Sequence, residues 1–143
     1  MIYVDTSSLL KLVITDDFSA ATDLAIFAET AVILSTLTEM EARVQLRGLL
    51  LGGRVSRTNA IRLRDKLLEI ICQSPFQQRD LPASVFHVAL AQNDASQIHC
   101  RSLDRIHLAA MSEMGIKRLM THDDRQANAA RELGYAVLMP GLA

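Results

Sequence analysis

The sequence predicts an α/β sandwich with a mostly parallel central sheet. Short apolar runs near residues 1–4, 31–35, 118–121 and 135–139 are continuous rather than alternating, which is typical of strands covered on both faces. Segments with apolar residues at helical spacing separate these runs. This order of strands and helices favours a parallel sheet between helical layers.

Two helices are expected after the first strand. One carries apolar residues between Leu9 and Ile14, and the second continues through Leu24 to Ala28 after a break at Asp16 and Asp17. The next strand leads into a strongly helical segment from Glu39 to Leu51. This helix should end at Gly52 and Gly53, because glycine adopts the left-handed conformation that ends helices.

The middle of the chain predicts a helical insert at about residues 54–95. Apolar residues between Thr58 and Cys72 mark one helix, and Pro82 is expected to open another that reaches Gln92. Only Phe76 to Leu81 can form a short strand there. Gly115 and Gly134 should end the last two helices. No repeat or linker interrupts residues 1–143, so we expect a single domain.

Composition narrows the functional classes. Half of the 143 residues are apolar and the net charge is −1, so any nucleic-acid surface must be a local patch. Cys72 and Cys100 fit no zinc spacing and are expected to be small buried hydrophobic residues. The chain opens without a basic leader, and no apolar run approaches the roughly 20 residues of a membrane span. We therefore expect a cytoplasmic protein without a membrane partner.

Acidic residues follow or begin several predicted elements. Asp5 and Asp123 follow apolar runs, Glu41 lies beyond a third run, and Asp104 stands at a predicted helix start. Carboxylates at the carboxyl ends of parallel strands point into the crevice where open α/β sheets bind ligands. A hard divalent cation relieves their repulsion, so the pattern predicts a site for Mg²⁺ or Mn²⁺.

Helix capping is the alternative explanation for each of these acids. Thr38 and Glu41 have the spacing of a capping box, Asp104 lies two positions after a possible Ser102 cap, and Asp123 can complement a helix dipole. Asp5 can also cap a helix. The metal site remains favoured because all four can reach one edge of one sheet, which independent caps do not require.

These residues also carry a family resemblance. Residues 1–12 resemble the opening of PIN-domain nucleases, specifically the VapC toxins of toxin–antitoxin pairs, and three acidic motifs follow in order at residues 35–41, 103–109 and 121–123. Gly134 and Pro140 also match the closing strand of that family. The resemblance implies a PIN-like α/β/α sandwich, with the helical insert where VapC proteins carry paired clip helices.

The resemblance further implies a metal-dependent ribonuclease. Asp5, Glu41, Asp104 and Asp123 would be its acidic quartet, with hydroxyl support from the side chains of Thr6, Ser7 and Thr121. Glu39 competes with Glu41, and Asp124 with Asp123. The implied reaction is hydrolysis of RNA phosphodiester bonds through carboxylate-bound Mg²⁺ or Mn²⁺.

A basic stretch from Arg43 to Lys66 is a candidate surface for RNA phosphates. Arginine binds phosphate through two parallel hydrogen bonds, and the candidates are Arg43, Arg47, Arg54 and Arg57. A solvated helix face with salt bridges is the alternative. Arg105, beside Asp104, is a further possible phosphate contact.

Other chemistries fit less well. His107 lies one helical turn after Asp104, which allows an Asp/His metal site. A histidine at such a position more often packs against the sheet. An Asp5-dependent phosphatase needs a second aspartate where the chain has Ser7. A non-catalytic PIN-like binding protein would have lost the acids.

The predicted partners are RNA, an antitoxin protein and further copies of the chain. The helices at residues 58–72 and 82–92 are more apolar than a small sheet can cover, which indicates a homodimer interface or a groove for an antitoxin helix. The resemblance implies both, in a homodimer or a higher toxin–antitoxin assembly. It also suggests that an antitoxin segment inhibits the acidic site with a basic side chain.

Overall fold

The computed structural model describes residues 1–142 and contains one parallel five-stranded sheet. The strand order is β3-β2-β1-β4-β5, and each neighbouring pair is parallel. The strands are β1 (Ile2–Val4), β2 (Val32–Ser35), β3 (Phe76–Arg79), β4 (Arg118–Met120) and β5 (Ala136–Leu138). The predicted strands are confirmed, including the short one within residues 76–81. The expected domain of residues 1–143 includes Ala143, which lies outside the described residues.

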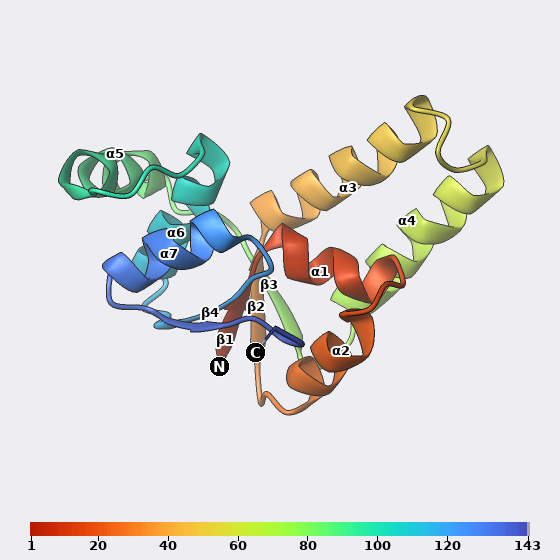
Figure 1. Ribbon diagram of the computed structural model, residues 1–143, viewed down its shortest axis with the longest axis horizontal. Helices are drawn as coiled ribbons and strands as arrows, with labels where there is room; N and C mark the ends of the chain where they lie inside the picture. The colour runs from red at the N-terminus through yellow and green to blue at the C-terminus, as the bar shows by residue number, and fades with distance from the viewer. Residues whose placement is uncertain (143) are drawn as a thin grey trace.

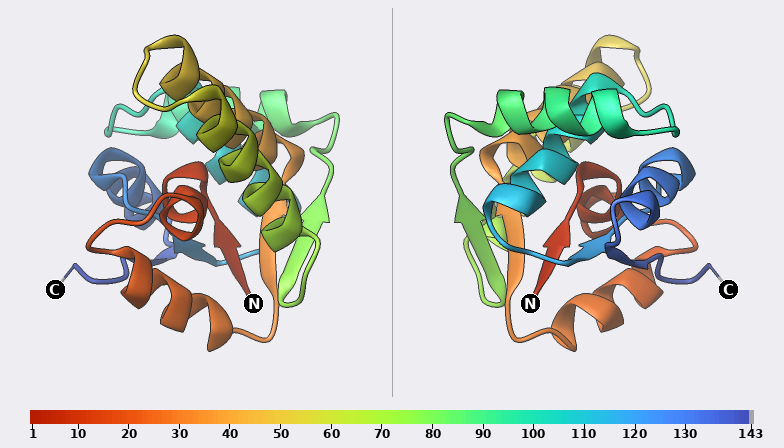
Figure 2. Two further views of the ribbon diagram at one scale, coloured as in Figure 1. Left: turned by 90° about the vertical axis from the view of Figure 1, so that its right-hand side faces the viewer. Right: turned by 90° about the vertical axis from the view of Figure 1, so that its left-hand side faces the viewer.

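Helices cover both faces of the sheet and confirm the α/β/α sandwich. Figure 1 shows one group beside α1 and a second group around α6 and α7, while α3 and α4 project from the sheet as a long hairpin. In Figure 2 the left view has α3 and α4 in front, and the right view has α5 in front. The helices are α1 (Thr6–Val13), α2 (Ser19–Phe27), α3 (Thr36–Leu51), α4 (Arg57–Ile71), α5 (Val85–Ala95), α6 (Ser102–Glu113) and α7 (Asp124–Glu132).

The alternation of side chains along β1 divides the core. Ile2 and Val4 face a cluster built with α1, α2, α3 and α4, whereas Tyr3 faces a second cluster built with α6 and α7. All three side chains are fully buried. Both faces of the strand are therefore apolar, which is why the sequence shows a continuous run instead of alternation.

The central position of β1 creates the crevice for a site. The chain passes from β1 to β2 and β3 on one side, and later adds β4 and β5 on the other side. Such a switch in strand order leaves a crevice at the carboxyl ends of the strands. Asp5 follows β1 directly at this edge, and its backbone N–H donates to the carbonyl of Met120 at the end of β4.

The helix expected over Glu39 to Leu51 is confirmed, and it extends back to Thr36 because Ser35 caps it immediately after β2. Two other local expectations were wrong. Pro82 does not open α5, which begins at Val85. Cys72 is exposed at the end of α4, whereas Cys100 is buried as expected.

Among residues 1–142, the structure has no helix with the length and apolar character needed to cross a lipid bilayer.

We propose that the insert belongs to the same folding unit as the sheet. Leu67 of α4 is fully buried in the cluster that contains residues of β1 and β2. Leu67→Ala should lower the free energy of unfolding by about 2–5 kcal/mol because it leaves a cavity in that shared core. Urea denaturation of the variant should show one transition, with its midpoint at a lower urea concentration than that of the wild type. Ile61→Ala, at an exposed position of the same helix, is the control, and separate unfolding of an insert would contradict the proposal.

Candidate functional site

Four carboxylates approach the carboxyl edge of the sheet from four different elements. Asp5 caps α1, Glu41 lies in the second turn of α3, Asp104 lies in the first turn of α6, and Asp123 caps α7. The capping explanation is thus correct for Asp5 and Asp123. It does not exclude a further role, because each carboxylate has a second oxygen and further lone pairs.

Asp5 is held in a nest of hydroxyl groups. Its Oδ1 accepts from the backbone N–H of Ser8 at 2.9 Å and from the Ser7 hydroxyl at 2.8 Å. Its Oδ2 accepts from the Thr121 hydroxyl at 2.6 Å. Burial nevertheless raises the pKa of Asp5, which is only 3% exposed. Such a buried and fully hydrogen-bonded carboxylate is poorly presented for the nucleophilic attack that a phosphatase would require.

Glu41 is oriented by contacts outside its own helix. Its Oε2 accepts from the Thr6 hydroxyl at 2.8 Å and contacts His107 Nε2 at 2.6 Å. Burial by itself raises the pKa of Glu41, but the hydrogen bond and attraction of His107 outweigh it and lower the pKa below its usual value. The expected capping box with Thr38 is wrong, because Thr38 instead pairs with Ser35 in a box one turn earlier.

A buried chain of hydrogen bonds stands behind Glu41. The Tyr3 hydroxyl lies 2.7 Å from His107 Nδ1 and 2.8 Å from the Ser35 hydroxyl. A carboxylate can only accept, so His107 Nε2 carries the proton donated to Glu41; in a neutral imidazole, Nδ1 then accepts from Tyr3. Burial raises the pKa of the Tyr3 phenol, which keeps it a donor. Both His107 nitrogens are therefore engaged, and the Asp/His metal site is not formed.

Asp104 and Asp123 share a cation from the protein itself. Arg101 Nη2 lies 3.2 Å from Asp123 Oδ2, and its Nε lies 3.7 Å from Asp104 Oδ2. Burial and then the charge of Asp123 raise the pKa of Asp104, while Arg101 opposes this rise. Glu41 also raises the pKa of Asp104, so its charge acts on the same cluster.

The carboxylate oxygens at this edge are ligands of the type that a divalent cation binds, but they do not surround a common point. Within residues 1–142, no three acid, histidine or cysteine side chains converge closely enough to hold an ion. Asp104 Oδ2 is nevertheless buried without a hydrogen-bond partner. A buried carboxylate oxygen left without a donor is costly, and it is an oxygen ligand of the kind that Mg²⁺ and Mn²⁺ take.

The competing acids face elsewhere. Glu39 pairs with Arg43 at 3.1 Å and accepts from Gln78, and Asp124 is exposed at the start of α7. His122 contacts the Ser8 hydroxyl at 2.9 Å and the Pro140 carbonyl at 3.0 Å, so it packs beside the site without pointing a free nitrogen into it. The structure therefore brings Glu41 and Asp123, rather than their neighbours, toward the other acids.

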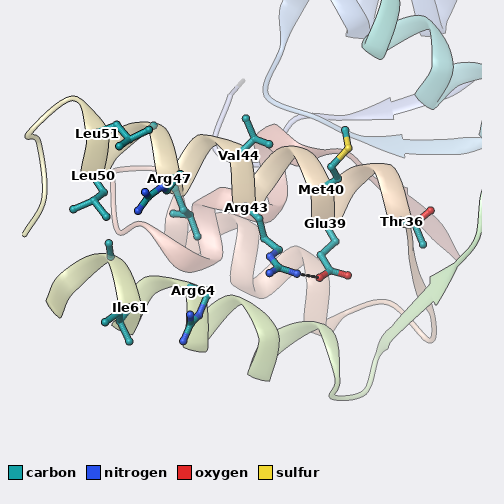
Figure 3. A pocket seen from close by; sticks show the side chains of 13 residues that line it. Thr36, Glu39, Met40, Arg43, Val44, Arg47, Leu50, Leu51, Ile61 and Arg64 are labelled. Atoms are coloured by element: carbon teal, nitrogen blue, oxygen red, sulfur yellow. Dashed lines mark hydrogen bonds and ion pairs between the residues drawn. The ribbon is translucent and has the colours of Figure 1, made fainter. Parts of the chain in front are cut away.

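The basic stretch lies along the projecting α3–α4 hairpin. Figure 3 shows Arg43, Arg47 and Arg64 beside a groove of about 830 Å³ between the two helices. Arg54 and Arg57 are exposed at the tip of the hairpin. The Arg43 pair with Glu39 matches the salt-bridge alternative at that position.

Large apolar side chains remain exposed on the same hairpin and on α5. They are Met40, Val44 and Leu51 on α3, Ile61 on α4, and Phe86 and Leu90 on α5. Met40 and Val44 are one helical turn apart, so they form the start of an apolar stripe. Ile61, Phe86 and Leu90 agree with the apolar surface expected on the helices at residues 58–72 and 82–92, whereas the apolar surface of α3 was not expected.

Arg101 and Tyr3 are the parts of the site that sequence reasoning missed. Arg101 precedes the third acidic motif, and its role depends on the approach of α7 to the start of α6. Tyr3 lies in a strand whose neighbours are all apolar, so a polar hydroxyl there was a usable signal. His107 was considered as a metal ligand, whereas it orients Glu41.

Comparison with known proteins gives consistent matches. The PIN domain family model matches residues 2–132. Ribonuclease VapC35 of Mycobacterium tuberculosis is 31% identical over 149 residues, covering 100% of this chain and 99% of that protein. Ribonuclease VapC46 of the same species is 50% identical over 42 residues, which are 28% of this chain and 32% of that protein.

Two solved structures share the fold. The crystal structure of Mycobacterium tuberculosis VapC20, described as a sarcin-ricin loop cleaving toxin, has a TM-score of 0.70 at 19% identity, covering 98% of this chain and 100% of that one. VapBC2 from Rickettsia felis, bound to a DNA fragment from its promoter, has a TM-score of 0.70 at 12% identity, covering 96% and 98%.

Neutralising Asp104 should stabilise the metal-free protein. The pKa of Asp104 is higher in the folded protein than in the unfolded chain, where it is about 3.9. Asp104 therefore stabilises the fold while it is protonated at low pH, and this stabilisation is lost as the pH rises through the folded pKa. We expect Asp104→Asn to raise the free energy of unfolding by about 1 kcal/mol at pH 8 with chelator present, and the gain to shrink toward pH 4. Urea denaturation at several pH values measures this.

The exposed Asp124 provides the matched control for that experiment. Asp124→Asn makes the same chemical change at the neighbouring helix start and should leave stability within about 0.5 kcal/mol. An Asp104→Asn protein no more stable than the wild type at pH 8 would contradict the repulsion inferred for the site.

Proposed function

Because this chain belongs to the PIN-domain family and aligns along its length with a VapC ribonuclease, we propose that its catalytic centre is the carboxyl edge formed by Asp5, Glu41, Asp104 and Asp123. The chain is a ribonuclease of the VapC type, the toxin component of a toxin–antitoxin pair. Divalent-metal dependence is general in this family. The Asp5-dependent phosphatase and the purely binding role are therefore set aside.

Asp104 Oδ2 is buried without a hydrogen-bond partner and has only the ion pair with Arg101 at 3.7 Å, and this observation carries the assignment of the metal site. We propose that Asp104 binds Mg²⁺ or Mn²⁺ together with Asp5 and Asp123, in place of the Arg101 guanidinium that now neutralises two of these acids. When bound, such an ion lowers the pKa of water and neutralises charge on a phosphate.

Glu41 is proposed to orient the attacking water. Thr6 and His107 both hold its Oε2, and Oε1 accepts no hydrogen bond within residues 1–142. The lowered pKa keeps the side chain ionised, so Oε1 is available to accept a hydrogen bond from water. His107 and Tyr3 act as positioning residues because they fix the carboxylate without reaching the substrate.

The substrate is proposed to be RNA long enough to follow the α3–α4 hairpin. Glu41 and Leu51, the last residue of α3, are separated by about 15 Å along the helix axis, from the rise of 1.5 Å per residue, and Arg54 lies beyond that end. A scissile phosphate at the acids and further phosphates at Arg43, Arg47, Arg54 and Arg57 would therefore belong to several nucleotides. Backbone contacts of this kind make binding depend on salt concentration.

The antitoxin is proposed to cover the apolar stripe of α3, defined by Met40, Val44 and Leu51. These residues are between 50% and 72% exposed, which is costly unless a partner covers them. An amphipathic antitoxin segment on this stripe would lead toward Glu41, where a basic side chain can oppose the acids. We further propose that the toxin forms a homodimer or a higher complex with the antitoxin, which light scattering on the purified proteins tests.

Cleavage of a structured RNA should require both Asp5 and a divalent metal. Asp5→Asn keeps the helix cap, because asparagine also caps helices, but removes the charge. We expect cleavage to fall by more than about 100-fold in this variant and to stop when chelator is added to the wild type. Asp124→Asn should cleave normally. Full activity of Asp5→Asn would refute the proposed centre.

Two surface variants should separate antitoxin binding from RNA binding. Val44→Asp should weaken the complex with the cognate antitoxin by at least about tenfold, since it places a charge in the apolar stripe. Leu24→Asp, at an exposed apolar position of α2, should not. Arg57→Met should raise KM for RNA while leaving kcat and antitoxin affinity unchanged. Affinity titration and cleavage kinetics measure these effects, and equal antitoxin affinity for all variants would exclude the stripe.

A further inference from the structure

The side chain of Arg105 is a buried cation without a direct acidic partner. It is 5% exposed, and no carboxylate oxygen forms an ion pair with it within residues 1–142. Its Nη2 donates to the Ser96 hydroxyl and the Ile98 carbonyl, both at 3.1 Å. Ser96 in turn donates to Glu132, so the closest compensation in this network is indirect.

Two donor atoms of this guanidinium remain unused. Arg105 Nε and Nη1 are buried and have no hydrogen-bond partner among the described residues. A buried charge with unpaired donors is costly, so a site that retains one commonly gains an anion as partner. The hydrogen bonds to Ser96 and Ile98 account for Nη2 alone, and they leave the other two nitrogens of the guanidinium without a structural role.

Arg105 lines a pocket between α5 and α6 that contains only neutral and basic side chains. The pocket has a volume of about 650 Å³, and no acidic residue contributes to its lining. Asn93, His99, Arg101 and Ser102 supply polar groups, while Phe86 and Leu90 supply an apolar rim. Ser102 is the first residue of α6, whose cap residue Arg101 makes no side-chain capping bond. The backbone N–H groups at the start of α6 are therefore not used by a side-chain cap, although Asp104 in the same first turn offsets part of the positive helix dipole.

The pocket adjoins the carboxylate cluster through Arg101. This side chain lines the pocket and also pairs with Asp104 and Asp123. A strand of RNA whose scissile phosphate lies at the acids would therefore place a neighbouring phosphate near the pocket.

We propose that the pocket between α5 and α6 is a phosphate subsite, in which Arg105, Arg101 and the start of α6 hold a phosphodiester of the RNA strand next to the one that is cleaved. The inference rests on the proposed ribonuclease function and adds a second contact to the same substrate. Charge complementarity favours this occupant over an apolar peptide, because Arg105 has no ion-pair partner and lines the space together with Arg101, whereas no acidic residue lines it.

The first test uses inorganic phosphate and chelator, so that no metal draws the anion to the carboxylates. Calorimetric titration at constant ionic strength should detect phosphate binding to the wild type. Asn93→Asp changes an exposed pocket residue without altering its size, and should weaken phosphate binding at least about fivefold through charge repulsion. Arg105→Met should weaken it about tenfold. Asn128→Asp, the same change on α7, should leave affinity unchanged.

The second test uses RNA cleavage with Mg²⁺ or Mn²⁺. Asn93→Asp should raise KM about fivefold while kcat stays within twofold, because the subsite holds substrate away from the reacting bond. Equal phosphate affinity in wild type and Asn93→Asp would overturn the subsite. Phosphate binding that responds to Asn93→Asp without any change in KM would also overturn it, since the pocket would then hold free phosphate and not RNA. The chelator experiment is independent of cleavage, so failure of the nuclease assignment is seen separately in Asp5→Asn.

Discussion

Repulsion between carboxylates at one edge of the sheet is the constraint on which the rest of the site depends. Burial raises the pKa of Asp5, and burial together with the charge of Asp123 raises that of Asp104. The fold offsets this cost with local donors: hydroxyl groups surround Asp5, and Arg101 lies between Asp104 and Asp123. The protein thus retains a cluster of acids that would bind a cation. The repulsion within this cluster lowers the stability of the fold, as is common at functional sites.

The buried network behind Glu41 connects both sides of the sheet to this edge. Tyr3 projects from β1 toward α6, while Ser35 at the end of β2 and His107 in α6 complete its hydrogen bonds. His107 then reaches Glu41 on α3. Because the Tyr3 and Ser35 hydroxyl groups and both His107 nitrogens have partners, the network fixes one arrangement of its elements as well as the direction of the Glu41 carboxylate.

Positive charge is distributed on two flanks of the acidic edge. Arg43, Arg47, Arg54 and Arg57 follow the α3–α4 hairpin on one flank, and Arg101 with Arg105 lies between α5 and α6 on the other. The net charge of −1 conceals both, because 16 acidic residues balance 15 lysines and arginines over the whole chain. A polyanion would meet attraction on both sides of the proposed cleavage site, and repulsion at its centre until a cation binds.

The sequence by itself determined the strands, the order of the helices and a short set of candidate acids, in which Glu39 competed with Glu41 and Asp124 with Asp123. Continuous apolar runs and helical spacing are local signals, and the mostly parallel sheet was predicted from them, whereas the strand order β3-β2-β1-β4-β5 was not. The acids could be named for the same reason, since residues after parallel strands must meet. Local pattern also predicted a capping box for Thr38 and Glu41, and there it failed, because Ser35 took that role one turn earlier. Tertiary structure alone decided that Glu41 rather than Glu39 turns toward the acids, that His107 orients a carboxylate, and that Arg101 joins two of them. Each of these depends on the approach of residues far apart in the chain, and no spacing within one segment specifies the direction in which a side chain from another element arrives.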